Sequence, residues 1–167
     1  MDRGHAARNG ARAMSLVFRR GDMFACPAEA IVNTVNCVGV MGKGVALEFK
    51  RRWPDNFRAY RKLCESGELR PGRVFVYEQA DLFGGDGRRF LVNLPTKDHW
   101  RDPSRIEWIE AGLEDFASQA RDLAMKSVVI PPLGCGNGGL DWAKVRPLIE
   151  GKLAELARHA EITVFEP

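Results

Sequence analysis

A glycine-rich segment late in the chain has the composition of a phosphate-binding loop. It contains four glycines, Gly134, Gly136, Gly138 and Gly139, and Asp141 then has the residue type that begins a helix. Glycine lets the backbone turn so that successive N–H groups converge, and the start of a helix adds partial positive charge. These properties suit a diphosphate, which we favour over a simple flexible turn.

A second glycine-rich segment lies earlier in the chain. Its sequence is Gly39-Val40-Met41-Gly42-Lys43-Gly44, and it also precedes an expected helix. It does not match the phosphate loop of the P-loop NTPases, because no hydroxyl residue follows Lys43. The late segment is no dinucleotide-binding fingerprint either, because it lies near the chain end and not after the first strand. Both of these nucleotide-binding classes are therefore disfavoured.

Polar residues follow several of the expected strands. Asp22 comes after the first strand, Asn33 and Asn36 end the second, and the run Thr96-Lys97-Asp98-His99 follows another. Ligands in open α/β sheets bind beyond the carboxyl ends of the strands. If the neighbouring strands are parallel, these residues and the late glycine segment face one cleft.

Lys97 is the candidate for catalysis in such a cleft. A lysine amine with limited access to water can act as a nucleophile, and as an ammonium it can stabilise negative charge on a departing group. His99 is a second candidate for catalysis. Trp100 provides an aromatic surface on which a base can stack, but packing is the commoner role for both residues and the one we favour.

Alternating strands and helices position these residues. Apolar runs predict strands at 16–20, 30–33, 74–78, 90–94, 128–130 and 162–165, and helical patterns predict helices at 45–53 and 56–66. A turn at 84–87 favours an antiparallel pair of the third and fourth strands. Ser104 and Glu107 have the spacing of a capping box, ahead of a helix whose buried face extends from Ile106 to Leu123. A last helix follows Asp141 and extends to Leu156. This order predicts a three-layer α/β/α sandwich with a mixed, mostly parallel central sheet.

Length and charge fit one globular domain. The chain has 167 residues, 45% of them hydrophobic, which we divide into a tail at 1–13, expected to be disordered, and a domain at 14–167. The net charge is +3, and the tail supplies +2 of it, from three arginines against one aspartate. The expected helices carry six basic residues, Lys50, Arg51, Arg52, Arg58, Arg61 and Lys62. We interpret them as a solvated helix face, although a path for a phosphate backbone has the same pattern.

Cysteine and histidine usage argues against a metal site. The four cysteines, Cys26, Cys37, Cys64 and Cys135, are irregularly spaced without a C-x-x-C pair, and the three histidines are scattered. The longest uncharged segments are too short for a membrane span, and no signal-peptide pattern is present. We therefore expect no metal, no cofactor, no membrane association and a cytoplasmic protein with reduced thiols.

Four segments together resemble the macrodomain family, whose members hold ADP-ribose. They are F-R-R-G-D-M-F at 18–24, I-V-N-T-V-N-C-V-G-V-M-G-K-G-V-A at 31–46, N-L-P-T-K-D-H-W at 93–100 and P-P-L-G-C-G-N-G-G-L-D-W at 131–142. Each is modest alone, but together they keep the family's order over residues 16–167. Within the family the chain is most similar to the macrodomains of DarG antitoxins, and it also resembles the human terminal ADP-ribose glycohydrolase.

The resemblance implies a function and a set of site residues. DarG macrodomains remove ADP-ribose that a DarT toxin places on thymine bases of DNA, so the expected partners are ADP-ribose, ADP-ribosylated single-stranded DNA and a DarT-type toxin. We expect a monomer. Asp22 would bind the adenine amine, Asn33 and Asn36 would orient the distal ribose, and Lys97 would be essential, with Asn36 assisting catalysis. The expected ADP-ribose contacts are Asp22, Met23, Asn33, Asn36, Val40, Met41, Gly42, Lys43, Gly44, Val45, Pro132, Leu133, Gly134, Cys135, Gly136, Asn137, Gly138, Gly139 and Leu140.

Departures from other macrodomains limit the choice of catalytic groups. Hydrolases of another branch carry an aspartate where this chain has Ala46, and the acidic residue that assists the lysine of the human relative falls at Gly138. The paired glutamates of poly(ADP-ribose) glycohydrolases are missing too. Lys97 favours turnover, because a binding module needs no amine beside the scissile bond. Two alternatives stay open: an ADP-ribose binding module without turnover, and an ADP-ribose 1″-phosphate phosphatase.

Overall fold

The computed structural model describes residues 15–80 and 85–167 and places six strands in one sheet. The strands are β1 (Leu16–Arg19), β2 (Ala30–Val35), β3 (Phe75–Glu78), β4 (Phe90–Pro95), β5 (Ser127–Ile130) and β6 (Glu161–Phe165). Their order is β1-β6-β5-β2-β4-β3, with β3 antiparallel to β4 and all other neighbours parallel. The prediction of a mixed, mostly parallel sheet is confirmed.

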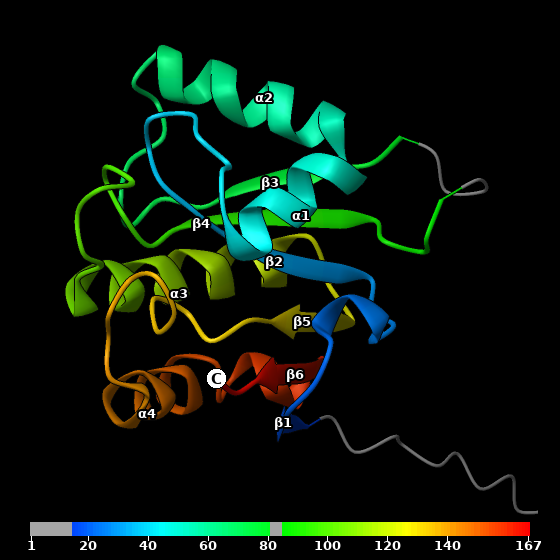
Figure 1. Cartoon of the computed structure of the whole chain (residues 1–167). Coiled ribbons are helices and arrows are strands. Elements are labelled where there is room, and N and C mark those ends of the chain that lie inside the picture. The colour runs from blue at the N-terminus through cyan, green and yellow to red at the C-terminus, as the bar shows by residue number, and fades with distance from the viewer. Residues whose placement is uncertain (1–14, 81–84) are drawn as a thin grey trace, which may run out of the picture.

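Helices cover both faces of this sheet. They are α1 (Gly44–Arg52), α2 (Pro54–Glu65), α3 (Ile106–Asp122) and α4 (Trp142–Lys152), with short 3₁₀ turns η1 (Met23–Ala25) and η2 (Leu156–Arg158). Figure 1 shows α1 and α2 on one side of the sheet and α3 and α4 on the other, which confirms the three-layer sandwich. No helix in the described ranges has the length and apolar content needed to cross a membrane.

Alternation along the central strands supplies the two layers of the core. On β2, Ile31 packs in the cluster that contains Phe49 of α1 and Tyr60 of α2, whereas Val32 packs in the cluster on the α3 and α4 side. Successive strand residues point to opposite faces, so a strand buried on both faces is apolar throughout. The only polar side chain buried in the middle of β2 is that of Asn33, at 0% exposure.

The predicted capping box at Ser104 and Glu107 is wrong. Helix α3 begins at Ile106, and its N-cap residue is Arg105, whose side chain makes no capping hydrogen bond. Ser104 lies one residue too early, because its N–H donates to the carbonyl oxygen of Gly138, 3.0 Å away, in the late glycine loop. Leu123, expected on the buried face, is the C-cap residue and is 37% exposed. The tertiary contact of Ser104 therefore decides where the helix starts.

Other boundaries move by a few residues. The predicted second strand extends beyond Asn33 to Val35, and the last helix ends at Lys152, with Leu156 continuing into η2. Helix α1 ends at Arg52, and Pro54 begins α2. The expected tail at 1–13 and the start of the turn at 84–87 lie outside the described residues.

Candidate active site

A cavity of about 760 Å³ lies at the carboxyl ends of β2, β4 and β5. This volume is within the range of pockets for small molecules and cofactors. Its walls come from the two glycine segments, the ends of β2 and β4 and the segment after β4. The lining residues are Thr34, Val35, Asn36, Val40, Gly42, Lys43, Gly44, Val45, Ala46, Thr96, Lys97, Trp100, Arg101, Pro131, Pro132, Gly134, Gly136, Asn137 and Gly138.

The start of α1 faces this cavity. Gly44, Val45 and Ala46 form the first turn of the helix and line the wall, and Lys43 at the N-cap makes no side-chain capping bond. The first N–H groups of a helix have no intrahelical acceptor, and the helix dipole places partial positive charge there. Gly44 has φ +56°, a left-handed conformation that favours glycine. This turn can therefore bind an anion with backbone N–H groups.

The late glycine loop forms the opposite wall, and its packing explains two of its glycines. A Cβ at Gly138 would overlap Ser104 Oγ and the backbone of Gly134. Gly134 has φ +72°, and a Cβ there would lie 2.7 Å from Leu140 Cδ1. The loop is therefore held in one conformation by contacts that only glycine allows.

The helix start that borders the cavity is not the one expected from the sequence. Asp141 caps α4 by accepting a hydrogen bond from the N–H of Ala143 at 3.0 Å, and it does not line the cavity. The carboxylate of Asp141 also places negative charge at the start of α4. Helix α1, not α4, thus supplies the dipole at this site.

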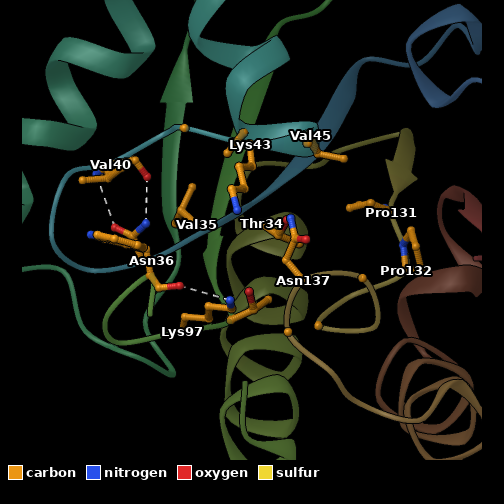
Figure 2. Close-up of a pocket in the computed structure, with 18 of the residues that line it drawn as sticks. Thr34, Val35, Asn36, Val40, Lys43, Val45, Lys97, Pro131, Pro132 and Asn137 are labelled. Carbon is orange, nitrogen blue, oxygen red and sulfur yellow. Dashed lines mark hydrogen bonds between the residues drawn. The ribbon is translucent and has the colours of Figure 1, made fainter. Parts of the chain in front are cut away.

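Three polar side chains line the cavity from different segments. They are Lys43 from the early glycine segment, Asn137 from the late loop and Lys97 from the segment after β4, as Figure 2 shows. Asn137 Nδ2 lies 3.8 Å from the position that a Cβ on Gly44 would take, so the two glycine loops approach each other closely. A ligand that fills the cavity contacts both loops.

Asn36 holds the loop that follows β2. Its Nδ2 donates to the carbonyl oxygen of Val40 at 2.7 Å, and its Oδ1 accepts from the N–H groups of Val38 and Val40 at 3.1 and 3.3 Å, as Figure 2 shows for Val40. The hydroxyl of Tyr60 lies 2.8 Å from Asn36 O and 2.9 Å from Oδ1. Burial raises the pKa of Tyr60 above its usual range, which keeps this hydroxyl a donor. The side-chain amide of Asn36 is therefore used mainly to hold the backbone of the cavity wall.

Lys97 is fixed at the junction of β2 and β4. The N–H groups of Thr96 and Lys97 lie 2.9 and 3.4 Å from the carbonyl oxygen of Val35, at the end of β2. The half-buried Lys97 side chain donates from Nζ to the carbonyl oxygen of Trp100 at 3.3 Å (Figure 2). The backbone contacts set the direction of the side chain, and the amine reaches the cavity.

His99 and Trp100 have different positions: His99 packs against Trp100, and Trp100 lines the cavity. The ring of His99 stacks on that of Trp100, with centroids 5.4 Å apart, and its Nδ1 accepts from the N–H of Arg101 at 3.1 Å. Trp100 lines the cavity and is 44% exposed, whereas His99 does not line it. His99, the second catalytic candidate, thus supports Trp100 in this structure.

Several expected ligand contacts lie away from the cavity wall. Asn33 is fully buried, and its Nδ2 donates to Asn93 Oδ1 at 3.3 Å across β2 and β4, while its own Oδ1 has no partner. Strand β2 continues past Asn33, so this side chain points into the core and does not line the cavity. The other expected contacts outside the lining are Asp22, Met23, Met41, Leu133, Cys135, Gly139 and Leu140.

Asp22 has a local role of its own. Its Oδ1 accepts from the N–H of Phe24 at 2.9 Å and caps η1. The side chain is exposed and follows β1, at the edge of the sheet. Met23 behind it is buried in the core cluster on the α1 side.

Sequence reasoning missed part of the wall. Thr34, Val35, Ala46, Arg101 and Pro131 line the cavity and were not among the expected contacts. Thr34 and Val35 were missed because β2 was expected to end at Asn33. Arg101 follows Trp100 directly, which was an available signal.

Charge in the cavity is one-sided. Among the described residues that line it, Lys43, Lys97 and Arg101 are cationic and none has a carboxylate. A site with cations and converging backbone N–H groups favours an anionic ligand. Within 15–80 and 85–167, no group of three or more histidine, cysteine, aspartate or glutamate side chains could hold a metal ion.

Comparison with protein families gives the same assignment as the motifs. The model of the Macro domain family matches residues 32–149. A Thermus aquaticus protein named DNA ADP-ribosyl glycohydrolase is 50% identical over 152 residues, which are 91% of this chain and 41% of that protein. A Mycobacterium tuberculosis protein of the same name is 48% identical over 84% of this chain and 39% of its own. The chain thus spans about two fifths of these relatives.

Solved structures share this fold. The macrodomain of Mycobacterium tuberculosis DarG superposes with a TM-score of 0.87 at 45% identity, over 92% of this chain and 98% of that one. Thermosipho africanus DarTG, solved in complex with ADP-ribose, superposes with a TM-score of 0.82 at 32% identity, over 91% of this chain and 41% of that one.

Proposed function

The chain belongs to the Macro domain family, and from this premise we propose that it binds ADP-ribose and hydrolyses the N-glycosidic link between ADP-ribose and thymine bases in DNA. Relatives that are 48–50% identical over most of the chain bear the name of that activity. They are more than twice as long, so the proposal concerns the macrodomain alone. The observation that carries it is the amine of Lys97 in a cavity that otherwise suits a diphosphate.

The cavity divides the ligand by chemistry. The diphosphate lies between the first turn of α1 and the loop from Gly134 to Gly138, where backbone N–H groups and Lys43 neutralise its charge. The distal ribose then lies toward the ends of β2 and β4, beside Lys97. The adenine extends from the cavity toward Asp22, which accepts a hydrogen bond from its amine. Asn36 acts beside the ribose by holding the backbone of Val38 and Val40, and Asn33 acts from below through its side-chain contact with Asn93.

The reaction breaks the bond between C1″ of the ribose and a nitrogen of the base. Overall, a hydroxyl from water goes to C1″ and a proton goes to the base. Lys97 assists in one of two ways. In the first, its amine attacks C1″ and displaces the base, and water then hydrolyses the bond between the lysine and ADP-ribose. In the second, its ammonium stabilises the base as it leaves. The contact of Nζ with the carbonyl of Trp100 keeps the amine at the cavity wall in either case.

The direct test is incubation with an oligonucleotide that carries ADP-ribose on thymine, with free ADP-ribose measured over time. Release supports the glycohydrolase. Binding of ADP-ribose without release from this substrate would instead leave a binding module, and release of phosphate from ADP-ribose 1″-phosphate alone would indicate the phosphatase. Lys97 favours turnover over mere binding, because an amine beside C1″ adds little to the recognition of free ADP-ribose.

A cognate ADP-ribosyl transferase toxin is the protein partner that this function implies. A Thermosipho africanus relative, 36% identical over 155 residues, is named as a fusion of a DNA ADP-ribosyl transferase with a DNA ADP-ribosyl glycohydrolase. We place the reaction in the cytoplasm. The DNA substrate is present there, and a reducing compartment is compatible with the free thiols of all four cysteines. One chain builds the whole described cavity, which is consistent with a monomer.

A further inference from the structure

An aromatic and cationic edge borders the opening of the cavity. Trp100 is 44% exposed and Arg101 is exposed, and both line the cavity beside Lys97. The guanidinium of Arg101 lies 4.7 Å from the centroid of the Trp100 ring. ADP-ribose as we place it leaves this edge free, because its diphosphate and riboses occupy the glycine loops and the ends of the strands.

The Trp100 ring is held in place. His99 stacks on it at an interplanar angle of 29°, and the N–H of Arg101 donates to His99 Nδ1, which fixes the imidazole in turn. An exposed indole loses rotamer freedom when a ligand stacks on it, and a ring that is already fixed has less to lose. The three residues form a preorganised stacking surface.

This surface is next to the reacting position. The carbonyl oxygen of Trp100 accepts the hydrogen bond from Lys97 Nζ, so a group bonded to C1″ beside the amine leaves the cavity past Trp100. The neighbouring loop adds apolar surface, because Val38 and Val40 are 45% and 40% exposed and the N–H of Cys37 donates to the carbonyl of Asp98 at 2.9 Å. Apolar surface beside the exit suits the faces of bases.

Arg101 differs from three of the four arginines on α1 and α2. On the two helices, Arg52, Arg58 and Arg61 each pair with a glutamate or aspartate one turn away. Arg101 has no carboxylate partner among the described residues and is available to a phosphate. Backbone phosphates and stacked bases are what a single strand of nucleic acid offers.

We propose that Trp100 and Arg101 form the subsite for the DNA strand of the substrate, with a base stacked on the Trp100 ring and a backbone phosphate on Arg101. This subsite rests on the proposed glycohydrolase function and names how the enzyme distinguishes modified DNA from free ADP-ribose. The basic face of α1 and α2 then contributes little to strand binding.

The test compares variants on an ADP-ribosylated thymidine oligonucleotide and on free ADP-ribose. Trp100→Ala should lower kcat/KM for the oligonucleotide roughly tenfold to a hundredfold, mainly through KM, and Trp100→Phe should retain most of it. Affinity for ADP-ribose, measured by calorimetry, should stay within about threefold of the wild type in both.

Arg101→Ala should lower kcat/KM on the oligonucleotide several-fold and reduce its log–log salt slope by about 0.7. On ADP-ribosylated thymidine nucleoside, which has no backbone phosphate, the same variant should lower kcat/KM by a smaller factor than on the oligonucleotide. Arg51→Ala is the matched control, because Arg51 is an exposed arginine of α1 outside the cavity wall.

Three results would overturn the subsite. They are full oligonucleotide turnover in Trp100→Ala, an equal loss of ADP-ribose affinity in that variant, and a salt slope that depends on Arg51 and not on Arg101. Failure of the proposed function is distinguishable, since the wild type would then release no ADP-ribose from DNA. In that event, anisotropy of an unmodified oligothymidine still tests the subsite, because Trp100→Ala should abolish its binding in the presence of ADP-ribose.

Discussion

Ser104 and Gly138 lie so close together that position 138 has no room for a side chain. The Ser104 N–H donates to Gly138 O at 3.0 Å, and a Cβ on Gly138 would lie 2.9 Å from the carbonyl carbon of Gly134 as well as overlapping Ser104 Oγ. The start of α3 and the late glycine loop are thereby joined at the cavity wall. This contact also means that an acidic side chain of the kind expected in the human relative cannot be accommodated at position 138 without moving the loop.

We predict that Gly138→Ala lowers the free energy of unfolding by about 1–3 kcal/mol and weakens ADP-ribose binding, because the loop must move to accept the methyl group. Gly136→Ala is the matched control for stability alone, since a Cβ there meets nothing within 4 Å but Gly136 lines the cavity. Chemical denaturation of both variants and calorimetry of Gly138→Ala measure the two effects. Equal stability of the two variants would show that the loop is not tightly packed against Ser104.

Asp22→Ala should weaken ADP-ribose binding about 10–100-fold, the usual effect of losing a charge-assisted hydrogen bond of about 1.5–3 kcal/mol. Because Asp22 also caps η1, Asp22→Ser is the control: serine can keep the cap but has no carboxylate to accept a charge-assisted hydrogen bond from the adenine. Calorimetry should show weak binding for both variants, and thermal unfolding should show near-normal stability for Asp22→Ser. Normal affinity in folded Asp22→Ala would limit the residue to its capping role.

Strand and helix periodicity were enough to predict the fold. The buried strands are apolar on both faces, and polar residues after them indicated the carboxyl edge where the cavity lies. Ser104 could be a helix cap or a partner of Gly138, and periodicity could not distinguish these two roles. The contact with Gly138 joins residues 34 positions apart in the sequence. Tertiary contacts decided such boundaries.

The site residues show the same division. The glycine segments and Lys97 were expected at the cavity from their residue types, and they line it. The position of Asn33 could not be found that way, since one or two further residues in β2 decide whether its side chain faces core or cavity. Asn93, the partner of Asn33, lies opposite it in the register of β2 and β4. The two residues are far apart in the sequence, so local patterns do not predict this pairing.

Thiol chemistry provides a prediction independent of catalysis. Burial, with a smaller contribution from the carboxylate of Asp141, raises the pKa of Cys135 to about 11. Only about one in a thousand of these thiols is then ionised at pH 8, and the thiolate is the reactive form. We expect slow alkylation of Cys135 by iodoacetamide in the native protein and fast alkylation in urea, followed by peptide mass spectrometry. Rapid native labelling would mean that the late loop opens often.

Hydrolysis should continue in EDTA and should change little when magnesium is added. The chemistry we assign to Lys97 and the backbone N–H groups uses no metal, and ligand spacing for one was not found in the sequence. Release of ADP-ribose from modified DNA, measured with and without chelator, tests this. Activity that EDTA removes and a divalent cation restores would contradict the assignment.

The last prediction separates an enzyme from a binding module at Lys97. An interaction made mainly in the transition state contributes little to ground-state binding, so Lys97→Ala should abolish release of ADP-ribose from modified DNA while affinity for free ADP-ribose stays within a few-fold. Lys97→Arg should be nearly as inactive if the amine is a nucleophile or carries a proton, because a guanidinium stays protonated. Single-turnover assays and calorimetry on the same preparations measure both properties.

Lys43→Ala is the matched control for Lys97→Ala. Lys43 is a second lysine of the same cavity, beside the expected diphosphate, so its loss should weaken ADP-ribose binding and leave turnover at saturation largely intact. Substantial turnover in Lys97→Arg would restrict Lys97 to an electrostatic role. Full turnover in Lys97→Ala would remove it from the mechanism altogether, and because His99 lies outside the cavity behind Trp100, the catalytic group would then have to be sought among the other lining residues.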